Sequence, residues 1–185
     1  MKFRIQPWDE VAKRSVWGMK NIVLIGMAGS GKSTLGVLLA KALGIPFVDT
    51  DLILQERESN LLQNIINQYG IEEFLRKEEK ALLTLDVDET VIATGGSAVY
   101  SPQAMQYLKE NGTIVYLKVN YNEIEKRIRN ITTRGIAIEK GKTLRDIYDE
   151  RIPLYEKYAD IVVDSQGKDF EESLEGILKK LKEKG

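Results

Sequence analysis

The stretch GMAGSGKS, residues 26–33, has the residue types and spacing of a loop that holds phosphate groups. It fits the pattern G-x-x-x-x-G-K-S/T, and it lies between an apolar segment typical of a buried strand and a segment with helical apolar spacing. Its glycines allow successive backbone N–H groups to point at one anion, beside the positive end of a helix dipole. The sequence therefore predicts binding of ATP or GTP. The residues expected to contact the nucleotide here are Gly26, Gly29, Ser30, Gly31, Lys32, Ser33 and Thr34.

Two side chains of this loop have specific expected roles. Lys32 would reach the β- and γ-phosphates, and the hydroxyl of Ser33 would ligate Mg²⁺. The chain contains no histidine and no cysteine, so a metal must be held by oxygen atoms, which are the ligands that Mg²⁺ prefers. The alternative, a glycine-rich turn with a chance lysine, is disfavoured by the strand and helix patterns on either side.

A pair of carboxylates, Asp49 and Asp51, follows a short apolar segment after the first helix. Side chains two apart on extended chain point the same way, so both can face the phosphate loop. One would then serve Mg²⁺ and the other an acceptor hydroxyl. The alternative is that the pair only caps the helix predicted from Leu52 onward.

A third group of candidates comes from the second half of the chain. Residues 130–143 form a polar segment with two glycines between two predicted helices, as expected of a lid that closes over a site. An arginine carried by such a lid can neutralise charge on a phosphoryl group, although an ordinary exposed loop has the same composition. Arg151 lies among apolar residues, and a buried arginine needs an anionic partner.

These residues must be positioned by alternating strands and helices. The pattern predicts an α/β fold with a parallel sheet, helices on both faces, and ligands at the carboxyl ends of the strands. Ser101 followed by Pro102 predicts a helix start. The predicted strands are 21–25, 91–94, 113–119 and 160–164, with a short strand before Asp49, and the predicted helices are 32–43, 72–85, 101–111, 121–130 and 143–158.

The composition limits the function classes. The chain has 185 residues with 43% hydrophobic side chains, which suits one soluble domain. Because 27 basic residues balance 28 acidic ones, no global field attracts nucleic acid or an anionic membrane. No run approaches a membrane span and the N-terminus lacks a signal-peptide pattern, so we expect a cytoplasmic protein that acts on a small molecule.

The first 18 residues differ from the rest and precede a second methionine, Met19. They are either the remnant of an upstream start or a short helix from Trp8 to Trp17 that docks on the domain or on a partner. We therefore expect one domain over residues 19–185, with residues 1–18 as an appendage and a candidate contact surface. The domain is expected to be a monomer.

Four motifs in this order, GMAGSGKSTLG, LGIPFVDTD, ATGGSAVYSP and ERIPLYEKYAD, resemble those of the shikimate kinases, and the similarity runs from Met19 to about Asp164. The resemblance implies a three-layer P-loop kinase fold with a central, mostly five-stranded parallel sheet and a mobile lid. It also implies transfer of a phosphoryl group from ATP to shikimate, with Mg²⁺, in aromatic amino acid biosynthesis.

The resemblance further implies a role for each matching residue. On the nucleotide side, Ser33 and Asp49 serve Mg²⁺, Arg127 stacks on adenine, and Arg134 contacts phosphate from the lid beside Lys32. On the acceptor side, the implied residues are Asp51 for the hydroxyl, Gly95 and Gly96 for backbone N–H groups, Glu78, and Arg151 for the carboxylate.

The sequence departs from the family pattern at the acceptor site. The family has an arginine directly after the phenylalanine of the acceptor-site helix, and here Leu75 takes that position. Arg76 follows about 100° further around a helix, and Glu78 is expected to lose its usual partner. Either Arg76 or a lid cation compensates, or the pocket takes a less charged acceptor.

There are two further departures, of which the one at Ser97 is mild. Ser97 stands where the family has a third glycine, and Gly135 follows Arg134, where we expect it to loosen the lid.

Other functions remain open at this point. One is a kinase of another small hydroxylated acid or polyol, although a gluconate-type kinase usually has a glycine between its two aspartates and a histidine soon after. A nucleoside monophosphate kinase would need more acceptor-side arginines than Arg57 and Arg76. A non-catalytic nucleotide-binding regulator would not need the complete set of Lys32, Asp51 and Arg134.

Overall fold

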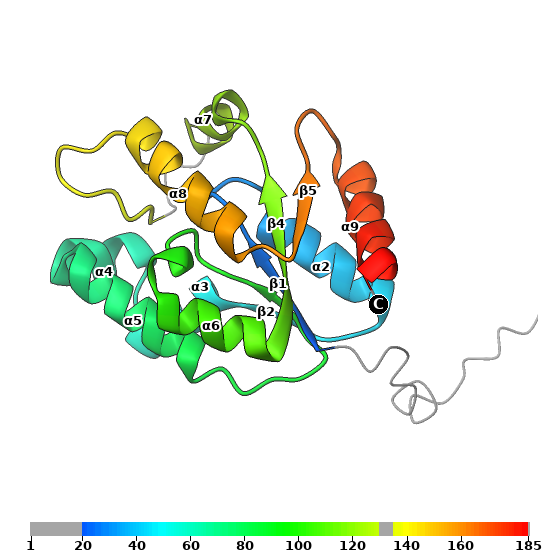
Figure 1. Cartoon of the computed structure of the whole chain (residues 1–185). Coiled ribbons are helices and arrows are strands. Elements are labelled where there is room, and N and C mark those ends of the chain that lie inside the picture. The colour runs from blue at the N-terminus through cyan, green and yellow to red at the C-terminus, as the bar shows by residue number, and fades with distance from the viewer. Residues whose placement is uncertain (1–19, 130–134, 185) are drawn as a thin grey trace, which may run out of the picture.

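The computed structural model describes residues 20–129 and 135–184. The predictions for residues 1–18, Met19 and Arg134 therefore lie outside the described residues. Within the described part, five parallel strands form one sheet in the order β2-β3-β1-β4-β5 (Figure 1). The predicted five-stranded parallel sheet is therefore confirmed. The strands are β1 (Asn21–Ile25), β2 (Phe47–Asp49), β3 (Val91–Ala93), β4 (Gly112–Lys118) and β5 (Ile161–Asp164).

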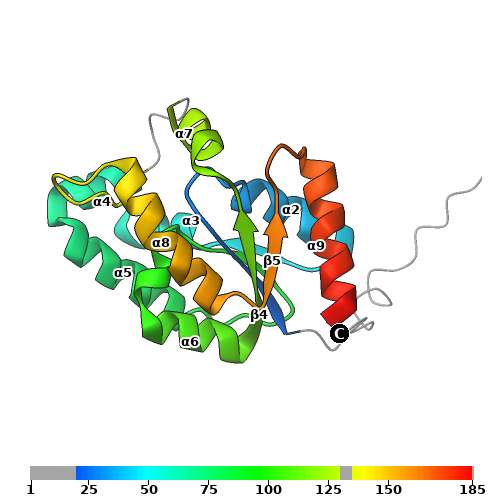
Figure 2. The same cartoon turned by 45° about the horizontal axis from the view of Figure 1, so that its top comes forward.

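Helices cover both faces of this sheet (Figures 1 and 2). Helices α2 and α9 pack on one face, and α5, α6, α7 and α8 supply the buried side chains of the other. Helices α3 and α4 stand at one side, next to α5. Their bounds are α2 (Lys32–Leu43), α3 (Thr50–Glu58), α4 (Leu62–Tyr69), α5 (Ile71–Leu83), η1 (Ala98–Tyr100), α6 (Pro102–Asn111), α7 (Tyr121–Arg129), α8 (Leu144–Tyr158) and α9 (Phe170–Lys184).

The central strand shows why its sequence is continuously apolar. Val23 and Ile25 of β1 contribute to the core beneath α6 and α8, while Ile22 and Leu24 contribute to the core beneath α2 and α9. All four are fully buried. A strand covered by helices on both faces needs apolar residues at every position, and this strand ends where the phosphate loop begins.

Helix starts follow the local signals. Ser101 accepts a hydrogen bond from the Ala104 N–H at 3.0 Å and Pro102 takes the first helical position of α6, which confirms the predicted start. Helix α8 begins with a capping box between Thr143 and Asp146. These caps fix where the chain enters the helices that flank the site.

A small apolar cluster joins the segment after Arg134 to α3, α4 and α5. Its buried members are Leu54, Leu62, Ile65, Phe74 and Ala137.

Gly135 lies in the same segment and approaches the start of α4 closely. A Cβ atom at Gly135 would lie 2.5 Å from the Leu62 Cβ and 2.7 Å from the Gln63 nitrogen. The missing side chain therefore permits close packing, a role that the sequence did not suggest, and the expectation that Gly135 loosens the lid stays a prediction. In both views the chain that precedes α8 runs beside α4 (Figures 1 and 2).

No helix in the described part of the chain combines the length and apolar character needed to cross a bilayer.

Candidate active site

The phosphate loop connects β1 to α2 and depends on its glycines. Gly26, Gly29 and Gly31 have φ angles of 145°, 80° and 96°, which side-chain-bearing residues rarely adopt. A Cβ at Gly26 would also lie 2.9 Å from the carbonyl oxygen of Leu117. The loop therefore has the curled backbone that the motif predicts.

Lys32 lies at the start of α2 and folds back over this loop. Its Nζ donates hydrogen bonds to the carbonyl oxygens of Gly26 and Met27 at 2.8 and 2.9 Å. The residue is only 7% exposed, so its ammonium group is held over the loop rather than in solvent.

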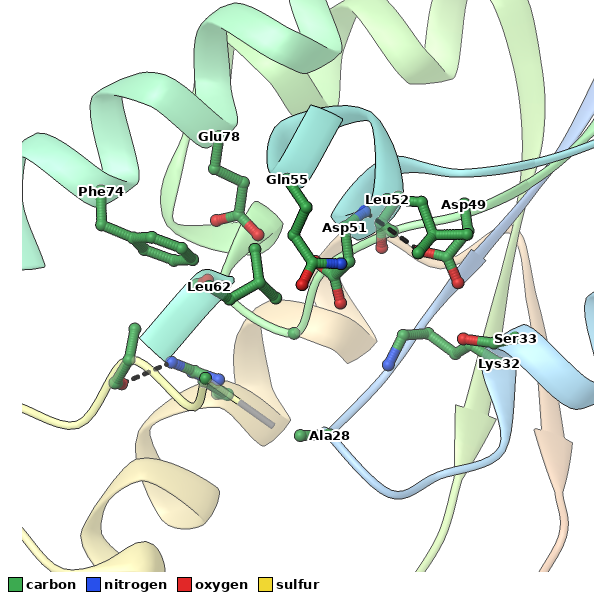
Figure 3. Close-up of a pocket in the computed structure, with 16 residues that line it drawn as sticks. Ala28, Lys32, Ser33, Asp49, Asp51, Leu52, Gln55, Leu62, Phe74 and Glu78 are labelled. Carbon is green, nitrogen blue, oxygen red and sulfur yellow. Dashed lines mark hydrogen bonds between the residues drawn. The ribbon is translucent and has the colours of Figure 1, made fainter. Parts of the chain in front are cut away.

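A cavity of about 340 Å³ opens beside Lys32. Figure 3 shows Lys32 and Ser33 on one side of it, Phe74 and Glu78 on the opposite side, and Asp51 between them. Its polar lining comes from β2, the start of α3, α5, the turn after β3, and α8. The residues that line it are Ala28, Lys32, Ser33, Asp49, Asp51, Leu52, Gln55, Leu62, Phe74, Glu78, Thr94, Gly96, Ser97, Gly135, Ala137 and Arg151.

Asp49 and Asp51 both line this cavity, but not for the reason that the sequence suggested. Asp49 ends β2 and caps α3, and its Oδ1 accepts a hydrogen bond from the Asp51 N–H at 3.0 Å. Asp51 lies in the first turn of α3, so the two residues are not on one extended strand. The helix-capping interpretation is correct for Asp49, and the cap itself fixes Asp51 beside the phosphate loop.

Glu78 reaches the cavity from α5 and is almost completely buried. The residue is 3% exposed, and its Oε1 has no hydrogen-bond partner among the described residues. Burial raises the pKa of Glu78 to about 7, although a hydrogen bond with Ser97 acts in the opposite direction and lowers this pKa. The loss of its usual arginine partner stays a prediction, and the atom without a hydrogen bond among the described residues is Oε1.

Arg151 is the buried cation of the acceptor end. It is 1% exposed, and its Nη2 and Nε donate hydrogen bonds to the Ala137 carbonyl at 3.0 Å and the Tyr100 hydroxyl at 3.2 Å. Its guanidinium carbon lies 4.9 Å from the centre of the Tyr100 ring. None of the ion pairs of the described residues includes Arg151, so its charge is available to an anionic ligand.

Gly95 and Gly96 allow these charged groups to converge. A Cβ at Gly95 would lie 2.0 Å from the Glu78 Oε1 and 2.8 Å from the Asp51 Oδ1, and one at Gly96 would lie 3.2 Å from the Arg151 Nη1. The Gly95 N–H already donates to the Thr50 hydroxyl at 3.2 Å. Of the two glycines, Gly96 lines the cavity.

A second cavity, of about 530 Å³, lies along the outer side of the phosphate loop. Arg127 borders it, and its Nη1 donates to the Gly29 carbonyl at 3.1 Å while its Nη2 pairs with Glu123. The hydroxyls of Ser30 and Ser165 are buried without a partner among the described residues. Its lining consists of Gly29, Ser30, Gly31, Thr34, Leu35, Arg127, Ser165, Lys168, Asp169, Phe170 and Ser173.

The second cavity contains residues that the sequence analysis missed. Ser165, Lys168 and Phe170 follow β5, which lies beside β4 and so ends at the same edge of the sheet as the phosphate loop. Because ligands bind at the carboxyl ends of parallel strands, the residues after the predicted strand 160–164 could have been expected at the site.

The structure does not bring Arg76 to either cavity. Its side chain is 71% exposed and pairs with Glu73 at 3.2 Å and with Glu72 at 3.9 Å. The structure therefore does not place Arg76 in the acceptor cavity, although Arg76 and Glu78 both line a separate, smaller cavity of about 130 Å³. Among the described residues, the cations that line the first cavity are Lys32 and Arg151.

Ser33 and Asp49 provide oxygen donors on the phosphate side of the first cavity, which fits the preference of Mg²⁺. No group of three or more acidic side chains in the described part could hold a metal ion alone. A metal at this point would share these two residues with phosphate oxygens and water.

Three features define the class of P-loop phosphotransferases: a phosphate loop on a parallel sheet, an adjoining cavity with paired carboxylates, and a buried arginine at the far end of that cavity. Comparison with known proteins makes this more specific. The family model of the shikimate kinases matches residues 28–182. A shikimate kinase of Thermodesulfovibrio yellowstonii is 37% identical over 164 residues, covering 87% of this chain and 94% of the relative.

Two solved structures agree with this match. The shikimate kinase of Acinetobacter baumannii in complex with shikimate aligns with a TM-score of 0.83 at 27% identity, over 90% of this chain and 94% of that one. The enzyme of Aquifex aeolicus aligns with a TM-score of 0.74 at 33% identity, over 89% and 97%. The chain belongs to the shikimate kinase family, whose members are ATP-dependent kinases that phosphorylate a hydroxyl group.

Proposed function

We propose that the protein transfers the γ-phosphoryl group of ATP to shikimate, giving shikimate 3-phosphate, with Mg²⁺ as the metal. The observation that carries the proposal is that one cavity joins the phosphate end, at Lys32 and Ser33, to a buried arginine and two carboxylates at the other end. Membership of the family supports shikimate as the acceptor. We further propose that the enzyme acts as a monomer in the cytoplasm.

Phosphoryl transfer depends on positioning and on neutralising charge rather than on covalent chemistry by the protein. Lys32 would exchange the carbonyl oxygens of Gly26 and Met27 for the phosphates of ATP. Mg²⁺, when bound through Ser33 and Asp49, would neutralise charge on the phosphate oxygens. The base would lie in the second cavity, bordered by Arg127.

At the acceptor end, Asp51 would orient the hydroxyl and accept its proton, since it lies on the same cavity wall between Lys32 and Glu78. Arg151 would pair with the acceptor carboxylate. Arg134 would contact the transferred group from the lid, as the family resemblance implies, and Gly96 would offer its N–H to the acceptor.

The test is release of ADP in a coupled assay, with and without shikimate. We expect Lys32→Ala to abolish turnover while the far-UV circular dichroism stays unchanged, and Asp51→Asn to lower kcat by about 10²-fold or more with little change in nucleotide affinity. Lys41→Ala changes an exposed lysine of the same helix and serves as the matched control. Undiminished turnover in Lys32→Ala would remove the proposal.

One observation favours a second candidate, a kinase of another small hydroxylated metabolite. Arg151 is the cation at the acceptor end of the cavity among the described residues, and Leu75 is half-buried against the apolar cluster of α3 and α4. Loss of one of two arginines that bind the acceptor carboxylate would weaken carboxylate binding by about 2 to 5 kcal/mol. A panel of shikimate, quinate, gluconate, homoserine, simple polyols and nucleoside monophosphates decides between the two by kcat/KM.

A further inference from the structure

The carboxyl group of Glu78 is placed as a ligand-binding group that has no counter-ion of its own. It is buried, lines the first cavity together with Arg151, and its Oε1 has no hydrogen-bond partner among the described residues. Two cations of α5 pair with other carboxylates, Arg76 with Glu73 and Lys77 with Glu58 at 2.8 Å, although Arg76 lines a smaller cavity with Glu78. The cavity therefore contains a carboxyl group that the folded protein leaves partly unsatisfied.

Charged and titratable groups face Glu78 from the elements packed around it. Asp51 of α3 disfavours its ionised form, whereas Arg151 of α8 and Lys32 of α2 favour it. Tyr155 of α8 also faces it, and its own pKa is raised by burial. Loss of solvent outweighs the two cations, which is why the pKa of Glu78 is raised to about 7 rather than lowered.

An acceptor that carries a carboxylate would bring a second negative charge to this end of the cavity. That carboxylate has Arg151 as its cationic partner, and the Arg151 Nη1 and the Glu78 Oε1 both crowd the two adjacent glycines, Gly96 and Gly95. Two carboxylates that share one site do not both stay ionised, so one of them takes up a proton. The paired acceptor carboxylate keeps its charge, which leaves Glu78 to be protonated.

Building on the proposed function, we propose that Glu78 binds a carboxylate-bearing acceptor as the neutral carboxylic acid, so that each acceptor molecule binds together with one proton taken up from solvent. In this state the Glu78 O–H becomes a hydrogen-bond donor inside the cavity. A neutral acceptor requires no proton, since the ionised carboxylate can accept a hydrogen bond from an acceptor hydroxyl. Glu78 thus makes the affinity for an acid acceptor depend on pH.

The size of the effect follows from linkage. For a group with a pKa of about 7, the protonated fraction falls about tenfold between pH 6 and pH 8, so the Kd for shikimate should rise by about that factor. The Kd for the carboxamide of shikimate, which keeps the hydroxyls and lacks the charge, should change little over the same range.

The experiment is isothermal titration calorimetry of the full chain with shikimate at pH 8, without nucleotide, in HEPES and in Tris. The difference in binding enthalpy between the two buffers gives the number of protons taken up, which should be about 0.9 per shikimate. Glu78→Gln should abolish this uptake, whereas Glu73→Gln, a change on the outer side of α5, should retain it. Leu75→Arg should also abolish it and lower the Kd about tenfold or more, because a cation three residues before Glu78 keeps the carboxylate ionised.

The outcomes separate this inference from the proposed function. Shikimate binding without proton uptake, or uptake that persists in Glu78→Gln, overturns the role of Glu78 and leaves the proposed function intact. No shikimate binding at any pH overturns the proposed function itself. If Glu78→Gln does not fold, the wild-type protein still decides, since equal uptake with shikimate and with its carboxamide would contradict the proposal.

Discussion

The buried carboxyl group of Glu78 links the stability of the fold to pH. Its pKa is about 7 in the folded protein against 4.5 for an ordinary glutamate. A carboxyl group whose pKa is higher in the folded state binds more protons when folded, so its contribution to the free energy of unfolding falls as the pH rises from about 4.5 through 7. The proposed acceptor binding and the stability should therefore both decrease as the pH rises, because both depend on the protonated form of Glu78.

We expect Glu78→Gln to remove this part of the pH dependence. At pH 8 the variant should be more stable than the wild type by about 2 to 3 kcal/mol, because the wild type holds an unpaired buried charge, and at pH 5 the two should differ little. Urea unfolding at both pH values measures the difference, with Glu73→Gln as the control on the same helix. If Glu78→Gln and the wild type differed in stability by the same amount at pH 5 and at pH 8, Glu78 would not titrate in this range.

At the scale of elements, the local patterns predicted most of the fold. The strand before the phosphate loop and the helix after Ser101 could be predicted because burial on both faces and an N-cap leave signals within a few residues. Helices α4 and α9 were not predicted, although α4 has apolar residues at helical spacing.

The acceptor site was harder to predict than the phosphate site because it is assembled from distant segments. The phosphate loop is one continuous stretch, whereas Glu78, Ala137 and Arg151 meet only after α5, the segment before α8, and α8 itself have packed. The contact of Gly135 with α4 joins residues far apart in sequence, and no local pattern contains it. Local reasoning consequently interpreted this glycine as flexible where the fold uses it for close packing.

Gly135→Ala tests that packing. The added methyl group would meet the Leu62 Cβ at 2.5 Å and the Gln63 nitrogen at 2.7 Å, so either α4 or the segment around Ala137 must shift. We expect a loss of about 1 to 3 kcal/mol in stability and a several-fold rise in the KM for shikimate, since Ala137 lines the acceptor cavity. Thermal unfolding and steady-state kinetics provide the two measurements.

Gly176→Ala is the matched control for this prediction. Gly176 lies inside α9, and a Cβ there would make an ordinary contact of 3.6 Å with Val163. Alanine favours a helix over glycine by about 1 kcal/mol, so this variant should be as stable as the wild type or more stable. If Gly135→Ala behaved like Gly176→Ala, the close contact with α4 would be unimportant.

At the scale of the whole molecule, the phosphate loop lies between the two cavities. The first holds the carboxylates and Arg151, the second holds Arg127 and Phe170, and residues of the loop or the start of α2 line both. With 27 basic and 28 acidic residues, the protein has no overall field to concentrate two anionic substrates. Local contacts must therefore bring both substrates together.

The described part of the proposed lid, residues 135–143, is tied to α8 by few polar interactions. Arg151 donates to the Ala137 carbonyl at 3.0 Å, and Lys142 pairs with Glu150 at 2.8 Å. The ion pair is partly exposed and contributes little to stability. An acceptor carboxylate that pairs with Arg151 would compete with the Ala137 carbonyl, so acceptor binding alone should loosen this attachment rather than close the segment.

We therefore expect the amides of residues 135–143 to be the least protected of the described core in hydrogen exchange, and to become protected only when both substrates are bound. Exchange measured by mass spectrometry with a non-hydrolysable ATP analogue, with shikimate, and with both ligands tests this. Helix α6, none of whose residues lines either cavity, provides the internal reference. Closure on the ternary complex requires both cavities to be filled together. Strong protection of residues 135–143 in the free protein would therefore contradict this prediction. Full protection with either ligand alone would contradict it as well.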